Sequence, residues 1–355
     1  MSEARVRLRP DVESVVPYRQ GRIAAADAFK LSSNENPFPP LPGVAEALRE
    51  VQFNRYPEGS ARAVRERLAT IWQVTPEQIV VTPGSAALLT YLMQATCTAE
   101  DEVLYAWRSF EGYPQFVGAL GVRSVQVPNR PDGGHDLPAM AAAVTDRTRL
   151  VLLCTPNNPT GPTITRDEFE AFMAAIPRTV LVGLDEAYAE FVTDPEAIRG
   201  DAALLERHPN LVVLRTFSKA YGLAGLRIGY GVGQEYVMDA IRAVAQPLAV
   251  TEPAQLAAIA SLDHEPALLE RVAVIVERRE RIRAGLLEQG WAVPEAQGNF
   301  VWLPTGERTA EVAAHFEAAG LVVRSLGEGV RVSIGEADSV EKLLRSAREV
   351  VVPLS

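Results

Sequence analysis

A lysine set among small residues is the first feature of the sequence that could do chemistry. Lys219 lies in the segment Arg215-Thr-Phe-Ser-Lys-Ala-Tyr-Gly-Leu-Ala-Gly-Leu-Arg227, directly after an apolar run. A lysine amine is a nucleophile only when it is deprotonated, and burial or a nearby cation can lower its pKa until an aldehyde traps it as an imine. Ser218 offers a hydroxyl donor and Arg227 a forked cation, and a phosphate needs both kinds of group. The segment therefore favours a phosphate-bearing aldehyde at Lys219 over a solvated surface lysine.

A carboxylate ends a second apolar run, Leu-Val-Gly-Leu-Asp185. A carboxylate at the carboxyl end of a buried parallel strand is costly unless it is paired. In a site for pyridoxal phosphate (PLP) its partner is the pyridinium nitrogen, and the acid keeps that nitrogen protonated so that the ring can accept carbanion charge. Tyr188, three residues on, can reach the phenolic oxygen of the same ring.

Two further segments have weaker signals. The segment Cys-Thr-Pro-Asn157-Asn158-Pro-Thr-Gly161 also follows an apolar run, and alone it would be an ordinary turn. With the aspartate and the lysine in order behind it, the functional interpretation becomes the better one. At Gly84-Ser85-Ala86 an apolar run turns into an apolar helix, whose free N–H groups favour an anion. By itself this segment is equally typical of a plain helix start.

The overall composition is that of a globular enzyme. The chain has 355 residues, 47% hydrophobic and 23% charged, enough for one large domain and a smaller one. The formal net charge is −10 and no basic cluster could follow a phosphate backbone, so no nucleic acid is expected as a partner. The four histidines lack metal-ligand spacing, so no metal is expected. With no signal peptide and no apolar run of about 18 residues, the sequence predicts a cytoplasmic protein without membrane contact.

The elements that must position these residues form two patterns. Up to about residue 247, strands are expected at 79–82, 102–105, 124–127, 150–154, 180–185, 211–215 and 228–232, and helices at 44–51, 61–71, 86–95, 112–119, 166–175 and 235–245. Strands separated by helices predict an α/β fold, with a mostly parallel sheet and helices on both faces.

The pattern changes at about residue 253. A long helical stretch is expected to about residue 289, followed by strands at 300–303, 321–324 and 330–334 and helices at 309–319 and 339–350, which is an α+β pattern. We therefore expect an N-terminal arm (1–30), a large cofactor-binding domain (31–250) and a smaller C-terminal domain (251–355).

In order and spacing, the motifs resemble those of a known family. The chain carries SSNENPF, RYPEG, CTPNNPTG, DEAYAEF and TFSKAYGLAGLRIGY, and it is similar over almost its whole length to fold-type-I PLP-dependent aminotransferases of the histidinol-phosphate aminotransferase subgroup. The segments WRSFEGYP, GNFVWLP and VVRSLGEGVRVS resemble more specifically the actinobacterial aromatic amino acid (phenylalanine) aminotransferases. The resemblance implies the PLP-dependent transferase fold type I and a homodimer. It also implies transfer of an amino group from an aromatic L-amino acid to 2-oxoglutarate, a 2-oxo acid.

The resemblance also implies roles for single residues. Lys219 would hold the cofactor as an imine and move the substrate proton, Asp185 would pair with the ring nitrogen, and Phe110 would stack on the ring. The remaining expectations are Asn158 and Tyr188 on the phenolic oxygen; Ser85, Ala86, Thr216, Ser218 and Arg227 on the phosphate; Tyr56 on the phosphate in the neighbouring subunit; Asn36 and Arg331 on the substrate α-carboxylate; and Tyr18 and Arg324 near the substrate side chain.

Two departures from the histidinol-phosphate enzymes favour the aromatic substrate. Gly84-Ser85-Ala86 stands where an acidic stretch is often found, and Trp107-Arg108 replaces a stretch with a proline. Tyr18 and Arg324 nevertheless remain available for a phosphate, so histidinol-phosphate aminotransferase stays the rival interpretation. A decarboxylase of a phosphorylated amino acid is a further alternative. A non-catalytic sensor on the same fold would lack the lysine or carry a fused DNA-binding region, and this chain has Lys219.

Overall fold

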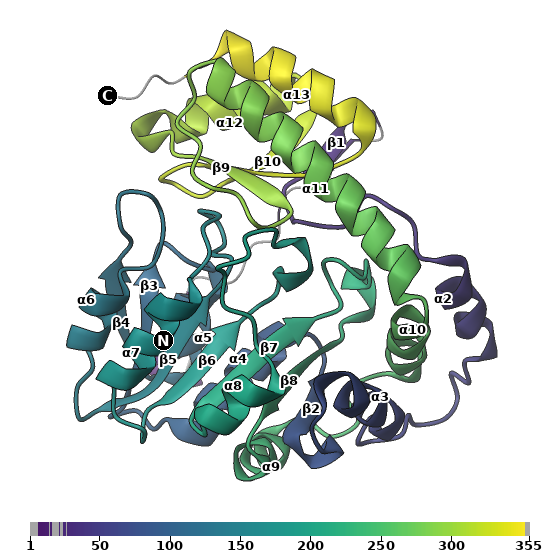
Figure 1. The fold of residues 1–355 in the computed structure, drawn as a ribbon, viewed down its shortest axis with the longest axis vertical. Helices are drawn as coiled ribbons and strands as arrows, with labels where there is room; N and C mark the ends of the chain where they lie inside the picture. Colours follow the sequence, from purple (N-terminus) through teal and green to yellow (C-terminus); the bar gives the residue numbers. More distant parts are fainter. Residues whose placement is uncertain (1–5, 14, 16–20, 22–23, 26, 352–355) are drawn as a thin grey trace, which may run out of the picture.

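The elements of the protein form two sheets, one large and one small (Figure 1). The computed structural model describes residues 6–13, 15, 21, 24–25 and 27–351. The long helix α11 (Glu265–Glu288) runs from the part that contains the large sheet to the part that contains the small one.

The large sheet has the strand order β2-β8-β7-β6-β5-β3-β4. Strands β3 to β7 are mutually parallel, while β8 is antiparallel to both of its neighbours. This confirms the expectation of a mostly parallel sheet. The strands are β2 (Ile79–Thr82), β3 (Glu102–Trp107), β4 (Arg123–Pro128), β5 (Thr148–Cys154), β6 (Leu181–Asp185), β7 (Leu211–Thr216) and β8 (Gly229–Gly233).

Apolar residues on both faces of the large sheet explain why helices cover both faces. In β5, Val151 and Leu153 belong to one buried cluster, and Leu150 and Leu152 to another, as the alternation of side chains along a strand requires. The first cluster includes residues of α3 (Arg62–Trp72), α7 (Arg166–Ala175) and α8 (Ala202–Arg207). The second includes residues of α4 (Ser85–Thr96), α5 (Gly112–Leu120) and α9 (Glu235–Val244).

Five of the predicted site segments lie at one edge of this sheet. Strands β3, β5, β6 and β7 are parallel, and β2 runs in the same direction because it and β7 are both antiparallel to β8. Their carboxyl ends therefore meet at the same edge, where open α/β sheets bind ligands. That edge receives the residues after Thr82, Trp107, Cys154, Asp185 and Thr216.

The small sheet has the order β1-β10-β11-β9. Its strands are β1 (Phe29–Leu31), β9 (Phe300–Leu303), β10 (Leu321–Ser325) and β11 (Val330–Ser333), and α11, α12 (Thr309–Ala318) and α13 (Ala337–Glu349) pack in the same part of the molecule. Strand β1 is a correction to the sequence analysis, which had placed residues 29–30 in the arm and Leu31 in the large domain. Leu31 is buried in the core of the small sheet.

The helical stretch expected between residues 253 and 289 is present but divided. The structure has two helices, α10 (Glu252–Asp263) and α11, separated at His264. Pro266 lacks a backbone N–H and cannot continue the hydrogen-bond pattern of α10. Helix α10 packs against α3 and α2 (Pro42–Ala47), in the core of the large sheet, although the expected domain boundary assigns it to the smaller domain.

Three short helices were not foreseen: α1 (Pro10–Glu13), α6 (Leu137–Ala142) and α8. Helices α6 and α8 each begin at an aspartate whose side chain accepts a hydrogen bond from the first turn: Asp136 from Ala139 N–H at 3.0 Å and Asp201 from Leu204 N–H at 2.7 Å. Because each has only six residues, their apolar periodicity is too short to detect. No helix among the described residues is long and apolar enough to cross a membrane.

Candidate functional site

Lys219 lies in the connection that leaves β7 and returns as β8. Its side chain is half-buried, and Nζ donates a hydrogen bond of 3.0 Å to the carbonyl of Ser33. Desolvation, followed by the positive charge of Arg331, lowers the pKa of the Lys219 amine to about 7. A large fraction of this amine is therefore neutral and nucleophilic near neutral pH.

Asp185 is the last residue of β6 and is buried. Tyr113 donates its hydroxyl proton to Oδ2 at 2.8 Å, and the N–H of Ala187 donates to Oδ1 at 3.3 Å. Burial nevertheless raises the pKa of this carboxyl to about 6. A buried carboxylate held by two neutral donors fits a cationic ligand group such as a pyridinium, because pairing with that group would offset the cost of its burial.

Tyr188 and Asn158 lie on the same side of the site as Lys219. The ring of Tyr188 is 5.8 Å from Lys219 Nζ, and its hydroxyl accepts a hydrogen bond of 3.0 Å from Nδ2 of Asn34. Burial raises the pKa of Tyr188. The Asn158 Oδ1 accepts a hydrogen bond of 2.5 Å from Arg331. A phenol from the β6 end thus lies beside the lysine from the β7 end, and an amide from the β5 end contacts Arg331.

The turn from β2 into α4 makes a close contact with Arg227. Gly84 has a φ of 85°, and a Cβ added there would lie 2.7 Å from the Arg227 guanidinium. Nη1 of Arg227 lies 3.4 Å from the Ser218 hydroxyl oxygen, and the Ser218 N–H donates 3.1 Å to the Thr216 hydroxyl.

This turn fits a phosphate. Ser85 and Ala86 are the first two residues of α4, a helix of 12 residues, and the N–H groups of a first helical turn have no partner within the helix. With a guanidinium and a hydroxyl beside them, they form a donor set that matches the phosphate of PLP.

Phe110 lies in the loop between β3 and α5. Its ring packs edge-on against Tyr113 at 5.5 Å and against Phe116 at 6.2 Å between ring centroids. Phe110 contacts Tyr113, which in turn donates its hydrogen bond to Asp185, so Phe110 lies close to the residue expected to bind the cofactor ring nitrogen. The stacking of Phe110 on the cofactor ring stays a prediction.

Arg331 on β11 enters the site from the small sheet. It is buried, with its Nη2 donating 2.8 Å to the carbonyl of Ser32 and its Nη1 bonded to Asn158. Arg324 occupies the directly opposed position on β10, and it forms an ion pair of 2.7 Å with Glu111. The two arginines expected to contact the substrate are therefore neighbours.

The remaining predicted residues are placed differently. Asn36 uses its amide on the chain itself: Nδ2 donates 2.8 Å to the Ala220 carbonyl, and Oδ1 accepts 2.9 Å from Phe38 N–H. The Tyr56 side chain is 85% exposed and does not join the site in its own chain. Tyr18 lies outside the described residues.

Three residues at the site were missed by the sequence analysis: Asn34, Tyr113 and Glu111. Asn34 is buried at a φ of 53° and bonds the Tyr188 hydroxyl. Its position within SSNENPF was the available signal. Tyr113 belongs to an apolar helix, where an aromatic residue normally means core. Glu111 lies within WRSFEGYP, but its contact depends on a partner 213 residues away in the chain.

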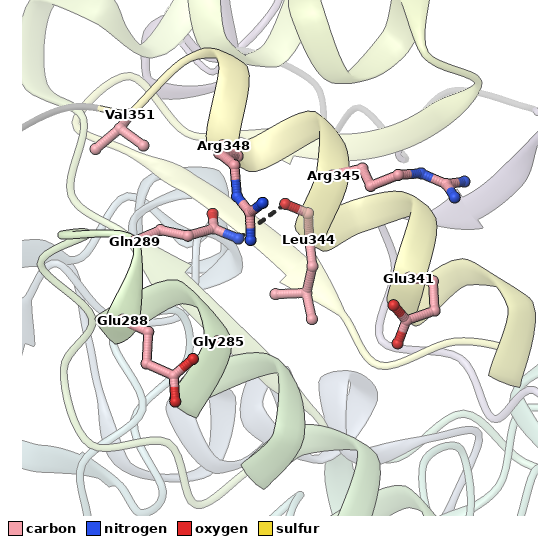
Figure 2. A pocket seen from close by; sticks show the side chains of 8 residues that line it. All are labelled: Gly285, Glu288, Gln289, Glu341, Leu344, Arg345, Arg348 and Val351. Carbon is pink, nitrogen blue, oxygen red and sulfur yellow. Dashed lines mark hydrogen bonds between the residues drawn. The ribbon is translucent and has the colours of Figure 1, made fainter.

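A surface pocket also lies between α11 and α13, and Figure 2 shows the side chains that line it. Gln289 closes one side of it by donating 2.9 Å from Nε2 to the Leu344 carbonyl. Its lining mixes the carboxylates Glu288 and Glu341 with the guanidinium groups Arg345 and Arg348. It contains none of the predicted site residues. Among the described residues no group of three His, Cys, Asp or Glu side chains could hold a metal ion.

Comparison with known proteins agrees with this geometry. Residues 26–346 match the family model described as aminotransferase class I and II. The chain is 50% identical over 351 residues to the aromatic amino acid aminotransferase of Streptomyces avermitilis, covering 97% of this chain and 98% of the relative. It is also 50% identical over 347 residues to the enzyme of the same name from Thermobifida fusca, covering 96% of each chain.

A solved structure resembles the whole fold. The crystal structure of histidinol-phosphate aminotransferase from Sinorhizobium meliloti in complex with pyridoxal-5′-phosphate has a TM-score of 0.88, 28% identity and 99% coverage of both chains. The described elements thus have a counterpart in a structure that holds this cofactor.

Proposed function

The chain belongs to the class I and II aminotransferase family, and from that membership we propose that it transfers the amino group of an aromatic L-amino acid to 2-oxoglutarate. The observation that carries the proposal is the Lys219 amine, whose pKa is lowered to about 7 by desolvation and then by the positive charge of Arg331. Amino-acid chemistry on an aldehyde cofactor needs three groups: a neutral amine, a cation that binds the substrate carboxylate, and a buried acid. Lys219, Arg331 and Asp185 provide them. Relatives about 50% identical over nearly their full length bear the aromatic name.

We propose that pyridoxal phosphate is held by residues at or after the ends of four strands, β2, β5, β6 and β7. Arg227, Ser218 and the start of α4 would bind its phosphate, Asp185 its ring nitrogen, and Tyr188 with Asn158 its phenolic oxygen. When bound, the cofactor supplies an electron-accepting ring and an aldehyde that carries the amino group.

The chain's own residues would do the rest of the chemistry. Arg331 would orient the substrate by binding its α-carboxylate with two parallel N–H groups. Lys219 Nζ, neutral for a large part of the time at pH 7, would take the α-proton and return it. The burial of Asp185 and Tyr188 supports a site from which water is largely excluded, and this would strengthen each of these interactions.

We further propose that the protein acts as a homodimer. Tyr56 and Phe53 are 85% and 88% exposed, although both are large aromatic residues of one short segment. A second subunit that covers this segment would remove apolar surface from water and would bring Tyr56 to the partner's phosphate site.

The amino-donor specificity tests the proposed function directly. Wild-type enzyme loaded with PLP should turn over phenylalanine with 2-oxoglutarate at a higher kcat/KM than histidinol phosphate. Lys219→Ala should stay folded and lose turnover by several orders of magnitude, because nucleophile and base are removed together. If histidinol phosphate is the better donor by about tenfold or more, the rival substrate replaces the aromatic one. Near-normal turnover of Lys219→Ala would reject the assignment of the lysine.

A further inference from the structure

Two arginines face each other across the β10–β11 pair. Arg324 is opposed to Arg331 in the antiparallel register, so their side chains project from the same face of the small sheet. Arg331 reaches Asn158 and the Ser32 carbonyl, which places this face against the site. Two like charges at directly opposed positions repel each other unless another group offsets one of them.

Glu111 offsets the charge of Arg324. It is the residue that precedes α5, directly after Phe110, and its Oε1 lies 2.7 Å from Nη2 of Arg324. The two side chains are only 15% and 17% exposed. A charge-assisted hydrogen bond that is largely removed from water holds its partners more firmly than an exposed ion pair does.

We propose that Glu111 is a specificity-determining residue that masks Arg324 from the substrate. This inference rests on the proposed function, in which Arg331 binds the α-carboxylate of the substrate. The side chain of the substrate then points towards Arg324, the neighbour of Arg331. An anionic substrate side chain must compete with Glu111 for Arg324, and if it succeeds it leaves a mostly buried carboxylate without its cation. An aromatic side chain makes no such demand. Glu111 therefore shifts selectivity towards uncharged side chains, and the second carboxylate of the proposed acceptor 2-oxoglutarate binds only in competition with it.

The chain contains a matched control for this ion pair. Arg108 and Glu328 join the same loop to the same β10–β11 hairpin with hydrogen bonds of 3.1 and 3.0 Å. Here the acid lies on the hairpin and the base on the loop, and the Glu328 side chain is 59% exposed. Removing Glu328 loosens the same two segments and leaves the Arg324–Glu111 pair in place.

The test compares two ligands that cannot react. Glutarate carries a second carboxylate, and 3-phenylpropanoate carries a phenyl ring instead. Their Kd values are measured by calorimetry on the PLP-loaded wild type, Glu111→Gln, Glu328→Gln and the double variant Glu111→Gln/Arg324→Gln. Single-turnover rates with glutamate and phenylalanine form the second readout. Each variant is first checked for an unchanged thermal transition, and Glu111→Ala replaces Glu111→Gln if the latter is unstable.

The proposal predicts a change in one variant alone. Glu111→Gln should improve glutarate binding relative to 3-phenylpropanoate by roughly tenfold or more, because one charge-assisted bond becomes available. Glu328→Gln should change the ratio by less than about twofold, as expected for an exposed pair. The double variant should return towards the wild-type ratio, since the gain depends on Arg324.

Three outcomes would overturn the inference: an unchanged ratio in Glu111→Gln, an equal shift in Glu328→Gln, or a gain that persists in the double variant. The second would identify a clamp between loop and hairpin instead of a mask. The proposed function has its own test. It fails if the wild type does not transaminate phenylalanine, whatever effect Glu111→Gln has on ligand binding.

Discussion

At the scale of single residues, the site is defined by two groups with opposite shifts. Burial lowers the pKa of Lys219 to about 7 and raises that of Asp185 to about 6, so each is driven towards its neutral form. Perturbed groups of this kind gather at functional sites because an acid, base or nucleophile must be matched to its task. Cys154, paired in register with Asp185, is buried too, and desolvation raises the pKa of its thiol to about 12. This thiol therefore stays protonated and adds no charge beside Asp185.

The raised pKa of Asp185 predicts how stability depends on pH in the cofactor-free protein. The folded carboxyl binds its proton more tightly than the unfolded one, so its contribution is fully present below about pH 4 and is lost as the pH rises through about 6. Relative to Asp185→Asn, the wild type should lose about 3 kcal/mol of unfolding free energy over the complete titration, at about 1.4 kcal/mol per pKa unit, and about 2 kcal/mol of this between pH 4 and pH 7. Urea unfolding of both proteins at pH 4, 5, 6 and 7 measures the difference.

The variant is its own control for this measurement, because all other titrating groups are shared by the two proteins. A difference that does not vary between pH 4 and pH 6 would mean that the Asp185 carboxyl titrates as it does in the unfolded chain. In that case burial would impose no cost on the ionised carboxyl, and the argument that a pyridinium partner offsets such a cost would lose its support.

At the scale of elements, the sequence predicts which strand ends carry the functional residues. It does not predict the contacts that distant parts of the chain make with these strand ends. Apolar runs that end at Asp185 or lead to Asn158 and Lys219 are local signals, and the common direction of parallel strands brings them together. The contact of Asn34 with Tyr188 joins residues 154 positions apart, and the pairing of β1 with β10 joins the chain's first strand to its tenth. No local pattern encodes such pairings, and a three-residue strand has too few residues to show an alternation.

The turn between β2 and α4 provides a test at this scale. Gly84→Ala should weaken PLP binding, because the new Cβ would lie 2.7 Å from the Arg227 guanidinium and a φ of 85° is strained for any residue with a Cβ. We expect a rise in Kd of roughly tenfold or more, and a loss of about 1–2 kcal/mol in stability. Fluorescence titration of the cofactor-free protein with PLP measures the first, and urea unfolding the second.

Gly225→Ala is the matched control for this turn. It adds the same methyl group to the loop that contains Lys219. The added Cβ would meet no atom within 4 Å beyond the neighbouring residues of the chain, and the backbone there is not left-handed. This variant should bind PLP as the wild type does. Equal affinities for PLP in wild type and Gly84→Ala would show that the turn does not cradle the phosphate.

At the scale of the whole molecule, the site of a single chain lacks one expected contributor. Tyr56 is 85% exposed and belongs to no hydrophobic cluster, whereas the other predicted phosphate ligands lie at the sheet edge. The sequence alone identified Tyr56 through the resemblance, but where its side chain acts depends on assembly, which single-chain patterns do not encode. In the homodimer that we propose, each Tyr56 would lie near the site of the other subunit, and neither site would be complete without the partner.

Hybrid dimers distinguish this arrangement from a site made within one chain. Tyr56→Ala and Lys219→Ala should each be impaired as pure proteins, the first mainly through weaker PLP binding. If Tyr56 acts across the interface, a hybrid of the two variants has one site with an intact lysine from one chain and an intact Tyr56 from the other. Random exchange makes about half of the dimers hybrids with one good site in two, so activity should recover to about a quarter of wild type at limiting PLP. If Tyr56 serves its own chain, every site in the hybrid carries one lesion and mixing restores nothing.

Tagged subunits, mixed and separated by affinity, make the hybrid available for direct assay, and Lys342→Ala in place of Lys219→Ala provides a control in which the lost lysine lies on α13.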